Sequence, residues 1–243
     1  MGVGIGLRVV TYNVHSLRDD VGALALLMRE LEPDIAIIQE APRRWRWRTR
    51  CARLAHSFGL YYAAGGLPAL GNLILTTLRV RVESTWHLRY PLTPGRHMRG
   101  AAFARCTVPG TDPFVVSGSH LSTHDREREA QATLLLRALD SFHDPVILGA
   151  DLNETPDGPA WQMLASGRTD PGSSPTFPAR SPDRRIDALL IDPRITVDSC
   201  FVADTPLAVQ SSDHLPLTAD LTFPHHRAHF VEQGREFMIN RKG

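Results

Sequence analysis

A chain of 243 residues with 42% hydrophobic and 22% charged residues has the composition of a globular protein that can bury a large core. Its formal net charge of +1 gives no overall field that would attract nucleic acid or a membrane surface, so any recognition of anions must be local. Cys51, Cys106 and Cys200 have no paired spacing, which argues against a disulfide framework or a zinc site. No apolar run reaches the roughly 18 residues of a membrane span and no signal peptide is apparent, so we expect a cytoplasmic protein without membrane contact.

In the first half of the chain, runs rich in Val, Ile and Leu alternate with helical patterns. They predict strands over 7–14, 34–40, 71–78 and 80–88, and helices over 19–33 and 42–59. The first helix has Asp19 or Asp20 as its cap and stops before Pro33; the second has Pro42 near its start and Gly59 past its end. The segment 63–71 is predicted to be a loop.

The second half continues this alternation. Strands are predicted over 100–108, 114–121, 145–151, 185–192, 196–204 and 214–223, helices over 125–142 and near 157–166, and loops over 89–99 and 167–184. Because both halves mix helices with hairpin-like series of strands, two packed mixed sheets with outer helices fit better than a doubly wound sheet. We therefore predict an α/β fold with one domain over 1–223 and a polar C-terminal tail over 224–243.

The stretch LGADLNETP, residues 148–156, places Asp151 and Asn153 where an apolar strand ends. A calcium-binding EF-hand loop is excluded, because the positions that require Gly and Glu hold Pro156 and Gln162. A turn stabilised by an Asn or Asp side chain explains Asn153, but it does not explain Asp151 at the strand terminus. Taken alone, the stretch leaves a turn and a functional site equally open.

Other predicted strands also begin or end on polar residues that suit catalysis or metal binding, namely Asn13, Glu40, His120, Asp187, Asp213 and His214. If the strands pack side by side, these ends converge on one edge of the fold. Mg²⁺ prefers oxygen ligands, which Glu40, Asn13 and Asp213 would supply. A histidine oriented by a carboxylate is a good base toward water, and His214 with Asp187 is the natural pair.

The ordered set TYNVH, QE, GNLILT, MRG, SHLS, LGADLN, TFP, RRIDALLI and SSDHLPL resembles the endonuclease/exonuclease/phosphatase superfamily, from about residue 7 to 223. The resemblance implies the DNase I-like fold, a four-layer αββα sandwich. It also implies dependence on Mg²⁺ or Mn²⁺ and hydrolysis of a phosphodiester or a phosphomonoester. Nucleic acid is one of several substrate classes in the family, and the sequence does not choose among them.

The resemblance also implies roles for the catalytic residues. Asp151 would orient the attacking water, and Asn153 would hold the phosphate. His214, oriented by Asp187, would be the base that deprotonates the water or a stabiliser of the transition state. His120 would contact the phosphate or act as a general acid.

For the binding residues, Glu40 resembles the principal metal carboxylate of the family, with Asn13 and Asp213 on the same metal side. Asn72 and Arg99 match positions that support the site or bind substrate phosphate. The alternative function is a metal-binding scaffold of the same fold that hydrolyses nothing and serves other, biosynthetic chemistry or partner binding.

Two features lie beside this set. The segment 43–53 interleaves arginines with Trp45 and Trp47, which suits nucleic-acid contacts. Because its arginines do not share one helical face, we favour a solvated helix whose tryptophans help cover the sheet. Near the C-terminus, His225, His226 and His229 are interpreted as surface histidines of the tail and not as a second metal site.

Overall fold

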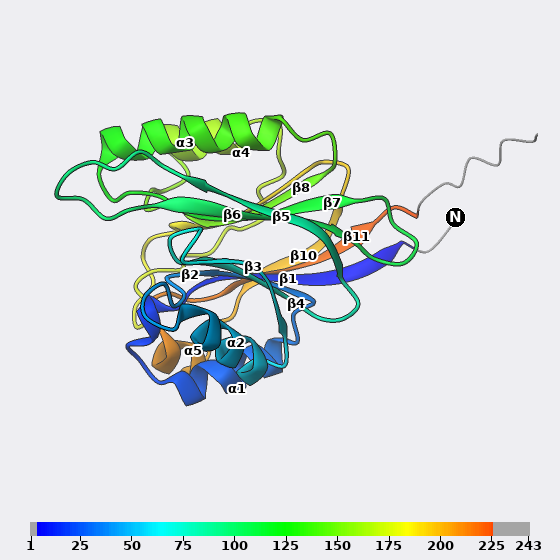
Figure 1. The fold of residues 1–243 in the computed structure, drawn as a ribbon, viewed down its shortest axis with the longest axis horizontal. Coiled ribbons are helices and arrows are strands. Elements are labelled where there is room, and N and C mark those ends of the chain that lie inside the picture. The colour runs from blue at the N-terminus through cyan, green and yellow to red at the C-terminus, as the bar shows by residue number, and fades with distance from the viewer. Residues whose placement is uncertain (1–3, 226–243) are drawn as a thin grey trace, which may run out of the picture.

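Two β-sheets stacked face to face form the centre of the molecule, and helices cover both outer faces (Figure 1). The computed structural model describes residues 4–225. This arrangement confirms the predicted sandwich of two packed mixed sheets with outer helices. No helix within the described residues has the length and apolarity that crossing a membrane requires.

The first sheet has six strands in the order β10-β11-β1-β2-β4-β3. Their bounds are β1 (Ile5–Asn13), β2 (Ile35–Gln39), β3 (Tyr61–Gly66), β4 (Asn72–Thr76), β10 (Thr196–Val202) and β11 (Leu217–Phe223). Strands β1 and β2 are parallel, and the other neighbours are antiparallel. The outer face of this sheet packs on α1 (Val21–Leu31), α2 (Trp47–Ser57) and α5 (Pro206–Ser211).

The second sheet has five strands in the order β5-β6-β7-β8-β9. They are β5 (Arg81–Arg89), β6 (Gly100–Thr107), β7 (Phe114–His120), β8 (Val146–Asp151) and β9 (Asp187–Ile191), and only β7 and β8 run parallel. Its outer face packs on α3 (Asp125–Asp140) and α4 (Pro159–Ala165), where Trp161 is fully buried.

The two sheets approach each other closely around Ile37. A Cβ added to Gly118 would lie 2.7 Å from Cγ2 of Ile37, and one added to Gly149 would lie 2.8 Å from its Cδ1. Both glycines therefore make room for a β-branched side chain of the opposite sheet, and larger residues would push the sheets apart. This packing sets the distance between strand ends that belong to different sheets.

Most predicted elements are confirmed, but two predictions are wrong and one short helix was missed. The helix predicted over 42–59 begins at Trp47, because Arg46 adopts a left-handed conformation with φ 55° and interrupts any helix from Pro42. Strand β3 occupies part of the loop predicted over 63–71, and α5 was not predicted. The latter carries a readable signal, since Thr205 caps it and Pro206 is its first residue.

Local signals at the helix ends otherwise agree with the structure. Asp20 caps α1 by accepting hydrogen bonds from the N–H groups of Gly22 and Ala23, and Gly59 follows α2 with φ 75°. Strand β11 ends at Phe223, and His225 forms an isolated bridge with Thr111. The rest of the predicted tail, including His226 and His229, lies outside the described residues.

Candidate active site

Three polar residues form a row across the edge of the second sheet. The strand register pairs His120, at the end of β7, with Asp151, at the end of β8, and pairs Asp151 with Asp187, at the start of β9. Side chains of paired residues project from the sheet about 5 Å apart, so the row follows directly from this register. All three are buried, and Nε2 of His120 lies 3.2 Å from Oδ2 of Asp151.

His214 contacts this row from the loop that precedes β11. Its Nδ1 lies 2.9 Å from Oδ2 of Asp187, and its Nε2 lies 3.8 Å from Oδ2 of Asp151. The backbone N–H of His214 donates to Oγ of Ser212, whose hydroxyl donates to the last carbonyl of β1 at 2.7 Å. The ring of Phe177 packs on the imidazole with centroids 4.8 Å apart. The ring is therefore fixed on several sides.

Burial and neighbouring charges oppose each other at this cluster. Burial lowers the pKa of His214, but the carboxylates of Asp187, Asp151 and Asp213 more than offset it and raise this pKa to about 10. Burial raises the pKa of Asp151 to about 6, against the attraction of His214. At neutral pH His214 is thus an imidazolium beside buried carboxylates, and Asp151 is more basic than an ordinary aspartate.

Asn13 joins the two sheets at this edge. Its Nδ2 donates to Oδ2 of Asp151 at 2.8 Å, and its Oδ1 accepts from the N–H of His15 at 3.0 Å. The other oxygen of Asp151 accepts from the N–H of Asn153 at 3.0 Å, a turn in which Asn153 has φ 51°. The amide of Asn153 also donates to the carbonyl of Leu121 at 3.0 Å. The turn and the site therefore use the same residues.

Arg99 decides which nitrogen of His120 carries the proton. Nη1 of Arg99 lies 2.8 Å from Nδ1 of His120, and a guanidinium can only donate. Nδ1 of His120 therefore accepts, which leaves the proton of the neutral ring on Nε2, 3.2 Å from Oδ2 of Asp151 and 3.0 Å from Nδ2 of Asn153. Burial and the charge of Arg99 lower the pKa of His120 well below its usual value, so the ring is neutral at neutral pH. Nε of Arg99 is buried without a hydrogen-bond partner among residues 4–225.

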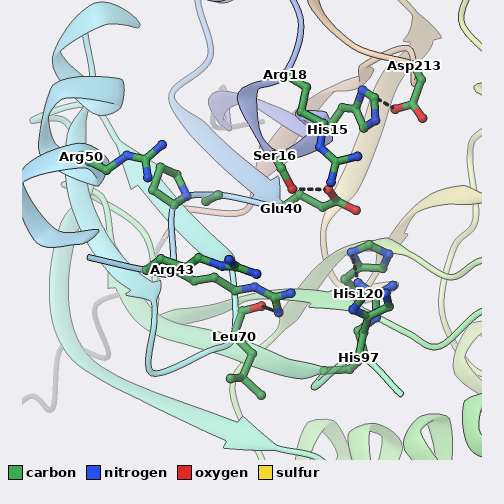
Figure 2. A pocket seen from close by; sticks show the side chains of 14 residues that line it. His15, Ser16, Arg18, Glu40, Arg43, Arg50, Leu70, His97, His120 and Asp213 are labelled. Atoms are coloured by element: carbon green, nitrogen blue, oxygen red, sulfur yellow. Dashed lines mark hydrogen bonds and ion pairs between the residues drawn. The ribbon is translucent and has the colours of Figure 1, made fainter. Parts of the chain in front are cut away.

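A cavity of about 520 Å³ opens beside the row, and Glu40, directly after β2, lies near its middle (Figure 2). Oε2 of Glu40 accepts from Oγ of Ser16 at 2.6 Å. Ser16 belongs to the short 3-10 turn η1 (His15–Leu17), in which all three residues have positive φ. Left-handed conformations are costly for residues other than glycine and occur most often at functional sites. Here they bring Ser16 to the carboxylate.

The donor atoms offer two places for a metal. Glu40 and Asp213 both line the cavity with carboxylate oxygens, the ligand type that Mg²⁺ prefers, and neither forms an ion pair with an arginine of the described chain. Asp151, Asp187 and His214 also bring ligand atoms within 4.8 Å of one another. In this second group His214 and Asp187 are already hydrogen-bonded to each other, and one of the ligand atoms is an imidazole nitrogen. The side of the cavity at Glu40 therefore fits a hard cation better.

The structure separates the predicted residues into groups. Glu40, Arg99, His120 and Asp213 line the cavity. Asn13, Asp151, Asn153, Asp187 and His214 form the hydrogen-bonded cluster next to it. Asn72 does neither: its Nδ2 donates to the carbonyls of Ala69 and Gly100 at 2.9 and 2.8 Å, and it does not line the cavity. Of the two roles predicted for Asn72, this arrangement fits support of the site, because the amide joins β4 to β6.

Several cavity residues were not predicted. His15 and Ser16 come two and three positions after Asn13 in the strand-end motif TYNVHS, a signal that was available. Nδ1 of His15 lies 2.7 Å from Oδ2 of Asp19 and 3.7 Å from Oδ1 of Asp213. His97 comes from the loop between β5 and β6 and carries no local signal.

The segment 43–53 divides between cavity and core. Arg43, Arg44 and Arg50 line the cavity, which the helical pattern alone did not indicate. Trp47 packs against the core beneath α2, as predicted, whereas Trp45 is 86% exposed and covers no sheet. The prediction is wrong for Trp45 because residues 42–46 are not helical.

Comparison with solved structures identifies several similar folds. The structure resembles an endonuclease/exonuclease/phosphatase from Bacteroides vulgatus with a TM-score of 0.75, at 18% identity over 90% of this chain and 100% of that chain. It resembles a mannosyl-6-phosphatase from Bacteroides thetaiotaomicron with a TM-score of 0.74, at 16% identity over 89% and 100%. D. rerio TDP2 complexed with a single-strand DNA product gives 0.73, at 18% identity over 89% and 99%. These TM-scores show a shared fold, and at such low identities the likeness shows the fold alone.

A search of curated proteins found no match to the chain. The model of the Endonuclease/Exonuclease/phosphatase family, by contrast, matches residues 10–214, which contain every residue of the hydrogen-bonded cluster and of the cavity. The order of the strand ends, the geometry of the cluster and this match agree. The chain belongs to the endonuclease/exonuclease/phosphatase family.

Proposed function

We propose that the protein is a phosphoesterase that depends on Mg²⁺ or Mn²⁺ and hydrolyses a phosphodiester or a phosphomonoester by attack of water. The observation that carries this proposal is the buried pair of His214 and Asp187, with Nδ1 and Oδ2 2.9 Å apart, next to Asp151. A histidine whose Nδ1 is engaged by a carboxylate presents Nε2 toward the reacting group, an orientation typical of hydrolytic sites.

In this proposal the cluster divides the work between proton transfer and charge stabilisation. Asp151 holds the water and takes its proton as the water oxygen attacks phosphorus. The bond to the leaving oxygen breaks, and the leaving oxygen takes a proton from solvent. The imidazolium of His214 and a side-chain N–H of Asn153 donate to the phosphoryl oxygens, and the Nε2–H of His120, 3.2 Å from Oδ2 of Asp151, holds that carboxylate in place. The raised pKa of His214 favours stabiliser over base, the two roles that the sequence left open.

Arg99 contributes the remaining positive charge beside the row. Its buried Nε has no partner within the described residues, so an anion in the cavity would satisfy it. A divalent metal, held by Glu40, Asp213 and Asn13, would neutralise further charge on the phosphoryl oxygens. The neutral state of His120 suits a hydrogen-bond donor better than a general acid.

The deciding experiment is hydrolysis of bis-(p-nitrophenyl) phosphate, p-nitrophenyl phosphate and plasmid DNA, with Mg²⁺ or Mn²⁺ and with EDTA. We expect turnover that requires metal and falls about 10³-fold in His214→Ala, the scale of losing one main transition-state stabiliser. His56→Ala is the matched control, because His56 lies near the end of α2 and does not line the cavity. Activity that survives His214→Ala would refute the proposed role of the pair.

The same assay tests the alternative of a non-hydrolytic scaffold. That alternative predicts metal binding without turnover of any phosphoester, with His214→Ala unchanged in metal affinity. It is the weaker candidate, because a scaffold has no need of a buried imidazolium between Asp187 and Asp151. The plasmid arm separates nucleic acid from small phosphate esters as the substrate class.

A further inference from the structure

We propose that Arg43, Arg44 and Arg50, called here the arginine wall, form a second anion subsite, so that the substrate carries a second phosphate beside the one that is hydrolysed. The inference rests on the proposed phosphoesterase function and specifies its substrate class. All three arginines line the cavity that contains Glu40 and His120.

One side chain of the arginine wall is held by hydrogen bonds to the backbone, and the other two are exposed to solvent. Nη1 of Arg43 donates to the carbonyls of Leu70 and Met98 at 2.9 and 3.0 Å, so its guanidinium is held in place. Arg44 and Arg50 are exposed side chains that line the same cavity. One preorganised cation beside two adaptable ones is an arrangement that suits a phosphate, which accepts several charge-assisted hydrogen bonds at once.

The carboxylates of the cavity do not neutralise this wall. Five arginines and two carboxylates line the cavity. Oε2 of Glu40 accepts from Ser16, and Asp213 faces His15, while no carboxylate within residues 4–225 forms an ion pair with an arginine of the wall. Positive charges that face one cavity repel each other, so a bound anion is the partner that relieves them.

The groups that would hold a phosphate lie on two sides of Glu40. In Figure 2, Glu40 lies between Arg50 on one side and His120 on the other. A phosphate placed for attack beside His120 is separated from Arg50 by Glu40, so Arg50 is left to bind a different anion. The cavity of about 520 Å³ lies within the range of small-molecule sites, so it has room for a second phosphate on the same ligand.

The second phosphate has two sources that share this chemistry. It is the terminal phosphate of a compact bisphosphorylated molecule, or the neighbouring phosphodiester of a nucleic-acid strand. Both present an anion a short distance from the scissile phosphorus, and both bind an arginine in the same way. The experiment therefore needs a probe for each source.

The test compares two chromogenic esters that differ by one phosphate. These are the p-nitrophenyl ester of thymidine 5′-phosphate and the same ester with an added 3′-phosphate, and release of p-nitrophenol gives kcat/KM. We expect the second phosphate to raise kcat/KM by about 10- to 100-fold, the effect of one or two charge-assisted hydrogen bonds. The double variant Arg44→Gln, Arg50→Gln is expected to lose this advantage and to retain its rate on the singly phosphorylated ester.

Arg48→Gln is the matched control. It removes one charge from α2, the helix that also carries Arg50. Its guanidinium lies over the ring of Trp47, 4.6 Å from the centroid, and does not line the cavity. A control that lost the advantage as strongly as the double variant would overturn the subsite in favour of general charge attraction. An equal rate on both esters in the wild type would also overturn it, whereas no metal-dependent turnover of these esters, of p-nitrophenyl phosphate or of plasmid DNA would refute the proposed function instead.

A binding measurement gives a second readout that does not depend on turnover. The metal-free protein is titrated with thymidine 3′,5′-bisphosphate and with thymidine 5′-phosphate in a calorimeter, for wild type and double variant. Tighter binding of the bisphosphate by the wild type alone supports the subsite, and equal affinities contradict it. A short single-stranded oligonucleotide that competes better than the bisphosphate assigns the second phosphate to a strand; weaker competition assigns it to a compact molecule.

Discussion

Nδ2 of Asn13 lies 2.8 Å from Oδ2 of Asp151, although the two residues are 138 positions apart and belong to different sheets. Asn13 ends β1 in the first sheet and Asp151 ends β8 in the second. The hydrogen bond stabilises the ionised form of Asp151, whose pKa is raised by burial. One amide therefore positions the carboxylate that is proposed to hold the attacking water.

Removing this amide should lower kcat more than it changes KM. We expect Asn13→Ala to reduce kcat by about 10- to 100-fold, the effect of losing one hydrogen bond to a charged group. Asn13→Asp should lose more, because it places a like charge beside Asp151. Steady-state kinetics with circular dichroism as a folding check decides the matter, and an Asn13→Asp enzyme with wild-type kcat would contradict the proposed role.

Ser16 should tune metal affinity through Glu40. The hydroxyl of Ser16 donates to Oε2 of Glu40 at 2.6 Å and fixes the orientation of the carboxylate. Loss of a hydrogen bond that orients a metal ligand typically weakens metal affinity by about 10- to 100-fold, so Ser16→Ala should raise the Mg²⁺ concentration for half-maximal activity about 10-fold. Ser57→Ala is the control, because within residues 4–225 its hydroxyl donates to the carbonyl of Leu54 and to no other group. An unchanged metal requirement in Ser16→Ala would refute Glu40 as a ligand oriented by Ser16.

The pair of His214 and Asp187 should make the stability of the metal-free protein depend on pH. The pKa of His214 is about 10 in the folded protein, against 6.5 as its ordinary value. Below about pH 6.5 the histidine is protonated in both states, so its stabilising contribution is complete. As pH rises toward 10, the unfolded chain has lost this proton while the folded protein keeps it, and the contribution is lost.

The measurement is urea unfolding in EDTA at several pH values between about 6.5 and 10, for wild type and His214→Gln. The difference in unfolding free energy between the two proteins should shrink as pH rises, because only the wild type carries this titrating pair. Groups that do not contact His214, such as the cysteines, contribute equally to both proteins. A difference that stays constant over the whole range would show that His214 is not protonated in the folded protein.

Gly149 should be required for the stacking of the two sheets. An added Cβ would lie 2.8 Å from Cδ1 of Ile37 and 2.9 Å from Oγ1 of Thr11, and both atoms belong to the facing sheet. We expect Gly149→Ala to lower the free energy of unfolding by about 1–3 kcal/mol, the cost of overpacking a core. In Gly6→Ala the new methyl meets no atom within 4 Å, so its unfolding free energy should change by less than about 0.5 kcal/mol.

The helix predicted over 42–59 shows how local and tertiary information divide. Its C-terminal signal, Gly59, is correct because a glycine beyond a helix end acts locally. Its start is wrong because Arg46 takes a left-handed conformation, and residues 42–46 follow an irregular path beside the cavity. Packing, and not helix propensity, determines the backbone conformation of residues 42–46. The positions of Arg43 and Arg44 could therefore not be derived from a helical wheel.

The sequence by itself determined the strands other than β3, their polar ends and the family, because apolar runs and the ordered motifs are visible in one dimension. It also paired His214 with Asp187 correctly, since the family motif and the chemistry of the two residues agree. Only the tertiary structure decided that Asn13 meets Asp151, that Arg99 sets the tautomer of His120, and that Asn72 stays out of the cavity. These relationships depend on how the two sheets are stacked and in what register, and no local pattern encodes the distance between two strand ends that belong to different sheets.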